Sequence, residues 1–149
     1  MRLRKIWLLC NLVCIIPGAF AQQFIHPGVL HSEKSLERIK RLVDQKAQPA
    51  YGSYEILAKL PEARADYQMK GPFEIISRDG KYGYTKGPSE RDFNSAYYNA
   101  LLWKITGKKA HADKSMEIIR AYARTVRQIP PTNDAPLCAG LQGFILVNA

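Results

Sequence analysis

Cationic, aromatic and amide side chains cluster in the middle of the chain, between residues 81 and 98. Cations pair with carboxylates, aromatic rings stack on sugar rings, and amide or phenol groups hydrogen-bond to hydroxyls. The cluster therefore favours binding of an anionic polysaccharide. Its members are Lys81, Tyr82, Tyr84, Lys86, Arg91, Asn94, Tyr97 and Tyr98.

Five of these residues are predicted to contact the substrate rather than to perform its chemistry. They lie on a glycine-bounded loop and at the start of the helix that follows, where side chains can reach a ligand. Arg91 is the strongest candidate, because its planar guanidinium can hold a carboxylate through two hydrogen bonds. Alternatively, Arg91 forms a surface ion pair with Glu90 or Asp92, the lysines are only solvated, and Tyr97 or Tyr98 belongs to the core. The five predicted contacts are Lys81, Tyr82, Arg91, Asn94 and Tyr98.

The sequence carries no pattern for other common chemistries. It lacks the Gly-x-Ser-x-Gly, phosphate-loop and dinucleotide-binding motifs, so no cofactor is expected. Its histidines are far apart and are interpreted as surface or capping residues, so no metal site is expected. Asp66, Asp79 and Asp92 have no helical spacing that would pair two carboxylates for glycoside hydrolysis. The histidines are His26, His31 and His111.

The N-terminus is predicted to be a signal peptide spanning residues 1–21. A basic start precedes an apolar run at residues 6–16, and Ala19-Phe20-Ala21 fits the pattern that signal peptidase cleaves. The run is too short to span a hydrocarbon core of about 30 Å, so no stable membrane insertion is expected after cleavage. The alternative, a buried N-terminal helix, explains neither the basic start nor the alanines. The mature protein is expected to be periplasmic or secreted.

Composition and charge narrow the class of protein further. With 46% hydrophobic and 23% charged residues, the chain is an ordinary globular protein rather than a disordered or low-complexity one. Its net charge is +9, and 19 basic residues remain against 13 acidic ones after residue 21. Basic proteins commonly bind nucleic acid, but export would separate the protein from that partner, and an anionic polysaccharide fits better. Only Cys138 remains in the mature chain, so no internal disulfide is expected.

Helical periodicity and capping residues predict an all-α fold. Ser32 is a good N-cap for the first helix, and Gly107 is the natural C-cap of a helix that is apolar nearly all round. The third and fourth helices are expected to form an antiparallel hairpin. The five predicted helices cover about residues 32–43, 49–60, 92–106 and 109–128, and the chain from residue 137 onward.

The segment between the second and third helices differs from the rest. Residues 61–90 hold several glycines and prolines and show no helical period, so a long irregular loop is predicted. A short strand is expected at residues 73–77, with a turn at residues 78–81. Loops of this length are often lids or binding loops, and a passive connector is the alternative.

Two segments of the chain resemble the alginate lyase domain family. The sequence HPGVLHSE at residues 26–33, followed by LERI at residues 36–39, is similar to the mature start of these proteins. The sequence NSAYYNALLWKITG at residues 94–107, with its continuation through Ala123, is similar to a helical hairpin of the family. The order and spacing of these segments extend the resemblance over most of residues 26–127.

The resemblance implies an (α/α) toroid, which is a ring of helical hairpins around a groove, and cleavage of alginate or a related polyuronate by β-elimination. In such enzymes a positive or amide group neutralises the substrate carboxylate, a Tyr or His base takes the C5 proton, and a Tyr acid protonates the leaving O4. The family's catalytic residues lie in later hairpins, beyond Ala149, so none is assigned in this chain.

Residues 22–149 are therefore expected to form the N-terminal part of a truncated, incomplete toroid. The last predicted helix has no stop signal, and no charged residue follows Asp134. The complete protein is expected to be a polysaccharide lyase, and this segment alone is expected to be inactive. The alternative is a non-catalytic helical-repeat protein of the cell envelope that binds glycans or other proteins.

Overall fold

The computed structural model describes residues 30–149, and the predicted signal peptide lies outside them. The described part is helical and contains no β-strand, which confirms the all-α prediction. No described helix is both long enough and apolar enough to cross a membrane. The α-helices are α1 (Glu33–Asp44), α2 (Ala50–Lys59), α3 (Lys86–Thr106), α4 (Lys109–Thr125) and α5 (Ala135–Val147), with 3₁₀ helices η1 (Pro61–Ala63) and η2 (Gly80–Thr85).

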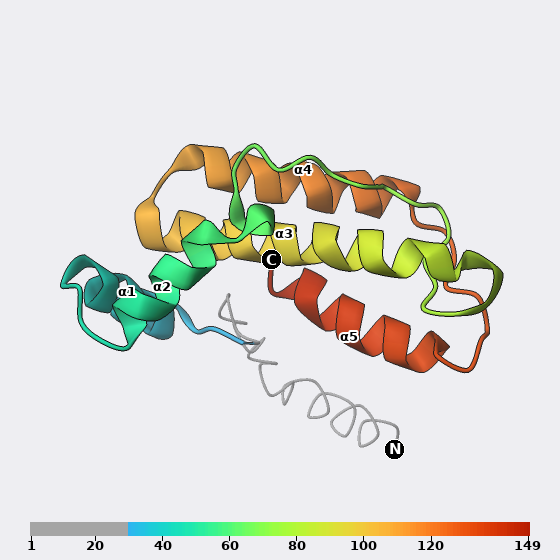
Figure 1. Ribbon diagram of the computed structural model, residues 1–149, viewed down its shortest axis with the longest axis horizontal. Coiled ribbons are helices and arrows are strands. Elements are labelled where there is room, and N and C mark those ends of the chain that lie inside the picture. The colour runs from blue at the N-terminus through green and yellow to red at the C-terminus, as the bar shows by residue number, and fades with distance from the viewer. Residues whose placement is uncertain (1–29) are drawn as a thin grey trace, which may run out of the picture.

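The long helix α3 lies at the centre of the arrangement (Figure 1). Helix α4 runs antiparallel to α3 on one side, and α5 lies on the other side. Helices α1 and α2 sit at the C-terminal end of α3. Gly107 ends α3 in the left-handed conformation, with φ of 71°, and so allows the tight turn into α4. The predicted helical hairpin is thus formed by α3 and α4.

The first helix begins as its capping residue predicts. The Ser32 side chain accepts a hydrogen bond from the Ser35 backbone N–H at 3.2 Å, and Glu33 lies in the first turn. Both features satisfy or complement the free N–H groups at the start of a helix.

Three predicted boundaries are wrong. Helix α3 begins at Lys86 rather than at residue 92. Pro88 does not prevent this earlier start, because it lies in the first turn, where a backbone N–H has no partner within the helix. Helix α4 ends at Thr125 rather than at residue 128, and α5 begins at Ala135 rather than at residue 137. The predicted strand at residues 73–77 is reduced to a single bridge between Ile75 and Gln128.

The irregular segment between η1 and η2 runs along the α3–α4 hairpin (Figure 1). It contributes Tyr67 and Ile76 to the core, so it is a packed part of the structure rather than a free connector. Its glycine at position 71 permits close approach to α4, since a Cβ there would lie 2.4 Å from the Tyr122 hydroxyl. The core cluster consists of Tyr67, Ile76, Phe93, Ala96, Ile118, Tyr122 and Cys138.

The prediction that this helix is apolar nearly all round is wrong for α3. Its inward face includes four polar residues that are completely buried, whereas Trp103 is 40% exposed. These polar side chains hold the irregular segment and α4, as described below. The four are Ser89, Asp92, Ser95 and Asn99.

Candidate functional site

A buried carboxylate fixes the N-terminal half of α3 against the irregular segment and α4. Asp92 Oδ1 accepts hydrogen bonds from the Tyr67 hydroxyl and the Lys70 backbone N–H, both at 2.8 Å. Asp92 Oδ2 accepts from the Gly71 backbone N–H at 2.8 Å and from the Tyr122 hydroxyl at 2.7 Å. Four donors therefore satisfy a carboxylate that has no exposed surface. Asp92 therefore holds α3 in place and is not itself accessible to a ligand.

The two tyrosines of this network make stability sensitive to alkaline pH. Burial, followed by the hydrogen bond to Asp92, raises the pKa of Tyr67 and that of Tyr122 far above the usual value. In the unfolded chain both phenols ionise near their ordinary pKa of about 10. The contribution of these two tyrosines to the free energy of unfolding should therefore stay constant below about pH 10 and fall as the pH rises further.

Chemical denaturation at several alkaline pH values measures this effect. The double variant Tyr67→Phe/Tyr122→Phe should lose stability at neutral pH and show a flatter decline above about pH 10. Tyr84→Phe, which alters an exposed tyrosine, serves as the control and should keep the slope of the wild type. An equally steep decline in the double variant would contradict this role for Tyr67 and Tyr122.

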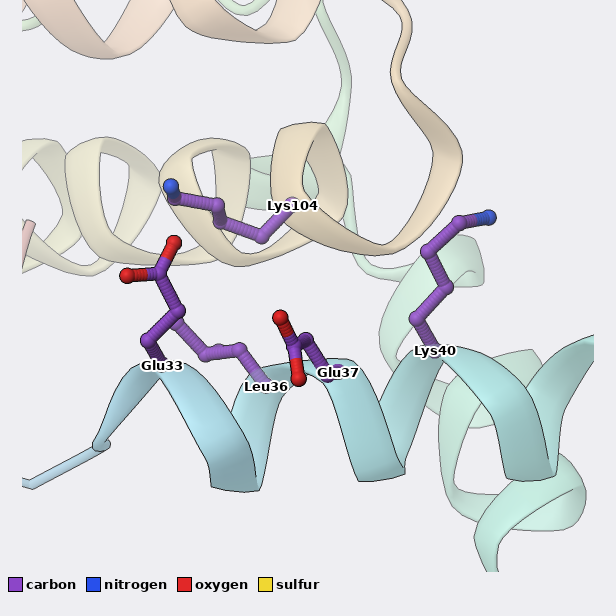
Figure 2. Close-up of a pocket in the computed structure, with 5 residues that line it drawn as sticks. All are labelled: Glu33, Leu36, Glu37, Lys40 and Lys104. Atoms are coloured by element: carbon purple, nitrogen blue, oxygen red, sulfur yellow. The ribbon is translucent and has the colours of Figure 1, made fainter.

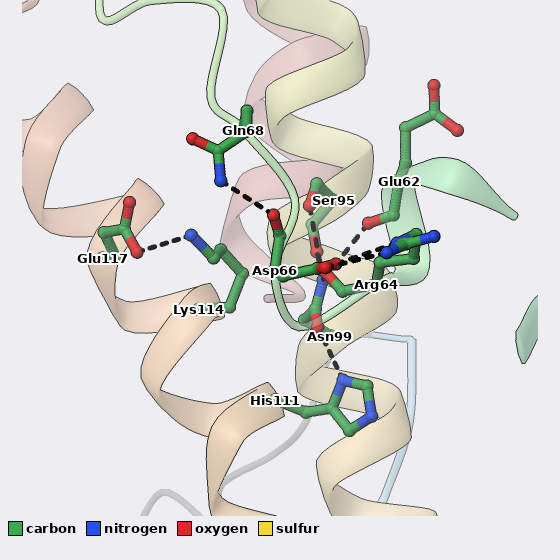
Figure 3. Close-up of polar contacts among 9 residues, drawn as sticks. All are labelled: Glu62, Arg64, Asp66, Gln68, Ser95, Asn99, His111, Lys114 and Glu117. Atoms are coloured by element: carbon green, nitrogen blue, oxygen red, sulfur yellow. Dashed lines mark hydrogen bonds and ion pairs between the residues drawn. The ribbon is translucent and has the colours of Figure 1, made fainter.

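A second polar network holds the C-terminal half of α3 (Figure 3). The Asn99 amide donates to the Ser95 carbonyl at 2.9 Å and to the Glu62 carbonyl at 3.2 Å. Asn99 Oδ1 lies 2.7 Å from His111 Nδ1, so the imidazole donates through Nδ1. Burial, followed by the charge of Lys108, lowers the pKa of His111, which favours the neutral ring. His111 thus connects α4 to α3. Its interpretation from the sequence as a surface or capping residue does not predict this role.

Two ion pairs lie around this second network in Figure 3. Arg64 and Asp66 form a bidentate pair with N–O distances of 2.8 and 2.7 Å, and this hydrogen bonding lowers the pKa of the Asp66 carboxyl. Lys114 pairs with Glu117 at 2.7 Å. Because their charges are already matched, these groups are poor candidates for binding an anionic ligand.

Three of the five predicted contacts share one side of α3. Arg91, Asn94 and Tyr98 are separated by three and four residues, the spacing that places side chains on the same helical face. Arg91 is exposed, and Asn94 and Tyr98 are half-buried. We call these three residues the α3 face. The face offers a guanidinium for a carboxylate, an amide for hydroxyls and an aromatic ring for stacking on a sugar.

The alternative partners of Arg91 are engaged elsewhere. Glu90 forms an ion pair with Arg78, and Asp92 accepts the four hydrogen bonds given above. Among the ion pairs and hydrogen bonds of residues 30–149, none involves the side chain of Arg91 or that of Asn94. Both side chains are therefore available for an external ligand.

A histidine–tyrosine pair borders the α3 face. His31 Nε2 lies 2.8 Å from the Tyr97 hydroxyl, and the two rings are stacked with an angle of 8° between their planes. The Tyr98 ring is 6.0 Å from that of Tyr97. Burial, followed by the neighbouring Tyr98, raises the pKa of Tyr97, so its phenol stays protonated and can donate a hydrogen bond. No local pattern signals this pair, since 66 residues separate its members.

The other two predicted contacts lie apart from the α3 face, on η2. The Lys81 ammonium lies over the Tyr82 ring, 5.3 Å from its centroid. Lys81 is exposed and Tyr82 is half-buried. Within the described residues, no hydrogen bond, ion pair or ring contact joins either one to the α3 face. The structure therefore brings together three of the five residues and pairs the other two with each other.

A small groove between α1 and α3 is unsuited to a polysaccharide (Figure 2). Its volume is about 90 Å³, well below the roughly 300 Å³ of small ligand pockets. Two carboxylates and two ammonium groups balance its charge. Lys40 also ties α1 to the end of α3, because it donates to the Ile105 carbonyl at 3.2 Å. The lining residues are Glu33, Leu36, Glu37, Lys40 and Lys104.

No cluster of three or more His, Cys, Asp or Glu residues suitable for a metal occurs in the described part of the chain. Comparison with known protein families, with curated proteins and with solved structures finds no match to this chain. The α3 face, bordered by the His31–Tyr97 pair, is therefore the candidate site on the grounds of its own chemistry.

Proposed function

We propose that this chain is the N-terminal part of a secreted or periplasmic polysaccharide lyase that cleaves alginate or a related polyuronate by β-elimination. In this proposal the described helices belong to an (α/α) toroid, and the α3 face forms part of the groove wall. The face binds the substrate, whereas the catalytic residues belong to hairpins beyond Ala149. The resemblance of residues 26–39 and 94–123 to the alginate lyase domain family supports this assignment.

The structural observation that carries the proposal is the α3 face itself. Its guanidinium has no carboxylate partner within the described chain, and a half-buried amide and a half-buried aromatic ring lie on the same side of one helix. A uronate offers the complementary groups, which are a carboxylate, several hydroxyls and a sugar face. Because α3 is held by two buried polar networks, these side chains stand on a rigid support.

A lyase assay with the complete protein tests the reaction. Incubation with polymannuronate, polyguluronate or polygalacturonate should produce chain ends with a C4–C5 double bond, detected by ultraviolet absorbance and mass spectrometry. The same polymers with their carboxyl groups reduced to alcohols serve as controls and should remain intact, because C5 then loses its acidifying neighbour. New reducing ends without unsaturation would indicate a hydrolase instead, and absence of cleavage on every uronate would contradict the proposal.

A second candidate function is a non-catalytic helical-repeat protein that binds other proteins. An apolar row along α5 favours it, because four large side chains there are 47–68% exposed while Cys138 and Gln142 on the other side are buried. Such a protein would bind a partner through α5 and would leave polyuronates uncut. The row consists of Leu137, Leu141, Phe144 and Val147.

A further inference from the structure

Exposed arginines follow the outer side of the second half of α4. Arg120 and Arg124 are four residues apart, which is about one helical turn or 6 Å along the axis. Arg127 lies two residues after the last residue of the helix, where its backbone N–H donates to the Glu74 carbonyl at 2.8 Å. The burial of Ile118 and Tyr122 fixes the inward side of α4 and turns Arg120 outward. We call Arg120, Arg124 and Arg127 the α4 arginine row.

Few carboxylates neutralise this row. The sequence has no Asp or Glu between Ile118 and Asn133. The acids of the first half of α4 are already paired, Asp113 with Lys109 and Glu117 with Lys114. No ion pair within residues 30–149 includes an arginine of the row. Glu74, an exposed residue of the irregular segment, is joined to Arg127 through its backbone carbonyl.

The helix dipole accounts for only part of this pattern. A cation in the last turn of a helix is favoured by the partial negative charge there, and Arg124 has that position. Arg120 lies before the last turn, and Arg127 lies after the helix has ended. Three exposed arginines without an ion-pair partner in residues 30–149 therefore gather at the end of α4, which favours a ligand with repeated negative charges.

We propose that the α4 arginine row is a second binding site for an anionic polysaccharide, separate from the α3 face. This inference rests on the proposed function, which supplies a polyuronate as the substrate. Each guanidinium can bind one carboxylate through two hydrogen bonds, and a polyuronate carries one carboxylate on every sugar. The row would retain a long polymer on the outside of the protein while the α3 face binds a short stretch of it.

Helix α1 provides a matched control. Lys34, Arg38 and Arg41 have the same spacing and are exposed, but Glu33 and Glu37 alternate with them on the same helix. Removing these three cations changes the net charge by the same amount as removing the arginine row. Any larger effect at α4 then reports a specific site rather than overall charge.

The test measures binding of the complete protein to a long polymannuronate and to a trimannuronate, at low and at moderate salt. The variant Arg120→Gln/Arg124→Gln/Arg127→Gln should bind the long polymer about tenfold more weakly, because three exposed pairs each contribute a fraction of a kcal/mol. Its affinity for the trisaccharide should be unchanged, and the difference should shrink as salt is added. The variant Lys34→Gln/Arg38→Gln/Arg41→Gln should bind the long polymer nearly as the wild type does.

Several results would overturn this inference, and they can be distinguished from a result that contradicts the proposed function. Equal losses in the α1 and α4 variants would show that only net charge matters. A loss of trisaccharide affinity in the α4 variant would show that the row and the α3 face are not separate. The row would belong to another partner if the protein bound duplex DNA or anionic phospholipid vesicles more tightly than the long polymannuronate and lost this binding in the α4 variant. If the wild type binds neither the long polymannuronate nor the trimannuronate, the proposed function itself fails.

Discussion

Replacing Asp92 with alanine should destabilise the protein more than any other single change proposed here. The substitution leaves two tyrosine hydroxyls and two backbone N–H groups buried without their acceptor. Each buried donor left without an acceptor costs about 1–3 kcal/mol, so the loss should be a large part of the roughly 5–15 kcal/mol that stabilises a typical domain. Urea denaturation should show a large fall in the midpoint, together with loosening of the irregular segment in hydrogen exchange.

Asp113→Ala is the matched control for this experiment. Asp113 is also an aspartate on a helix of the hairpin, but it is 62% exposed and pairs with Lys109 four residues earlier. Such surface pairs contribute about 0.5 kcal/mol or less. If Asp92→Ala were as stable as Asp113→Ala, the network around Asp92 would not be what holds the irregular segment to α3 and α4.

Replacing Arg91 with alanine should weaken the binding of short oligouronates by about ten- to a hundredfold. This range corresponds to the roughly 1.5–3 kcal/mol that a charged hydrogen-bonded contact contributes. In the complete enzyme the same loss should raise KM with little change in kcat, because the contact is made in substrate and transition state alike. Isothermal titration calorimetry measures the affinity, and steady-state kinetics separates KM from kcat.

The fold should be unaffected, since the Arg91 side chain is exposed and makes no hydrogen bond or ion pair within residues 30–149. Arg41→Ala, on the exposed side of α1, removes the same charge away from the α3 face and should leave affinity within about twofold of the wild type. Arg91→Lys should recover only part of the affinity, because an ammonium cannot form the planar, two-bonded contact. Unchanged affinity and kinetics in Arg91→Ala would contradict the assignment of the α3 face.

Local signals in the sequence predicted most of the helices. Ser32 and Gly107 each fix a helix end through the backbone itself, so their roles could be read without knowledge of the tertiary fold. The start of α3 was missed because Gly87 and Pro88 are usually helix breakers, yet both fall in the first turn, where they are tolerated. The bridge at Ile75 depends on Gln128, far along the chain, and no local pattern announces it.

The candidate site was predictable only where its residues share one helix. The spacing of Arg91, Asn94 and Tyr98 already places them on one face. Lys81 and Tyr82 were grouped with them by closeness in sequence, but the structure pairs these two residues with each other on η2. Long-range contacts account for the remaining differences, because the four donors to Asp92 and the partner of Tyr97 come from segments 21 to 66 residues away.

The most direct test of the central claim is a nuclear magnetic resonance titration of the ¹⁵N-labelled protein with a saturated trimannuronate. If the α3 face binds an anionic polysaccharide, the side-chain signals of Arg91 and Asn94 and the backbone signals around Tyr98 should shift together with one dissociation constant. The signals of Lys34, Arg38 and Arg41 on α1 should stay in place. Absence of any shift at a high trisaccharide concentration, or shifts confined to residues outside the α3 face, would contradict the account.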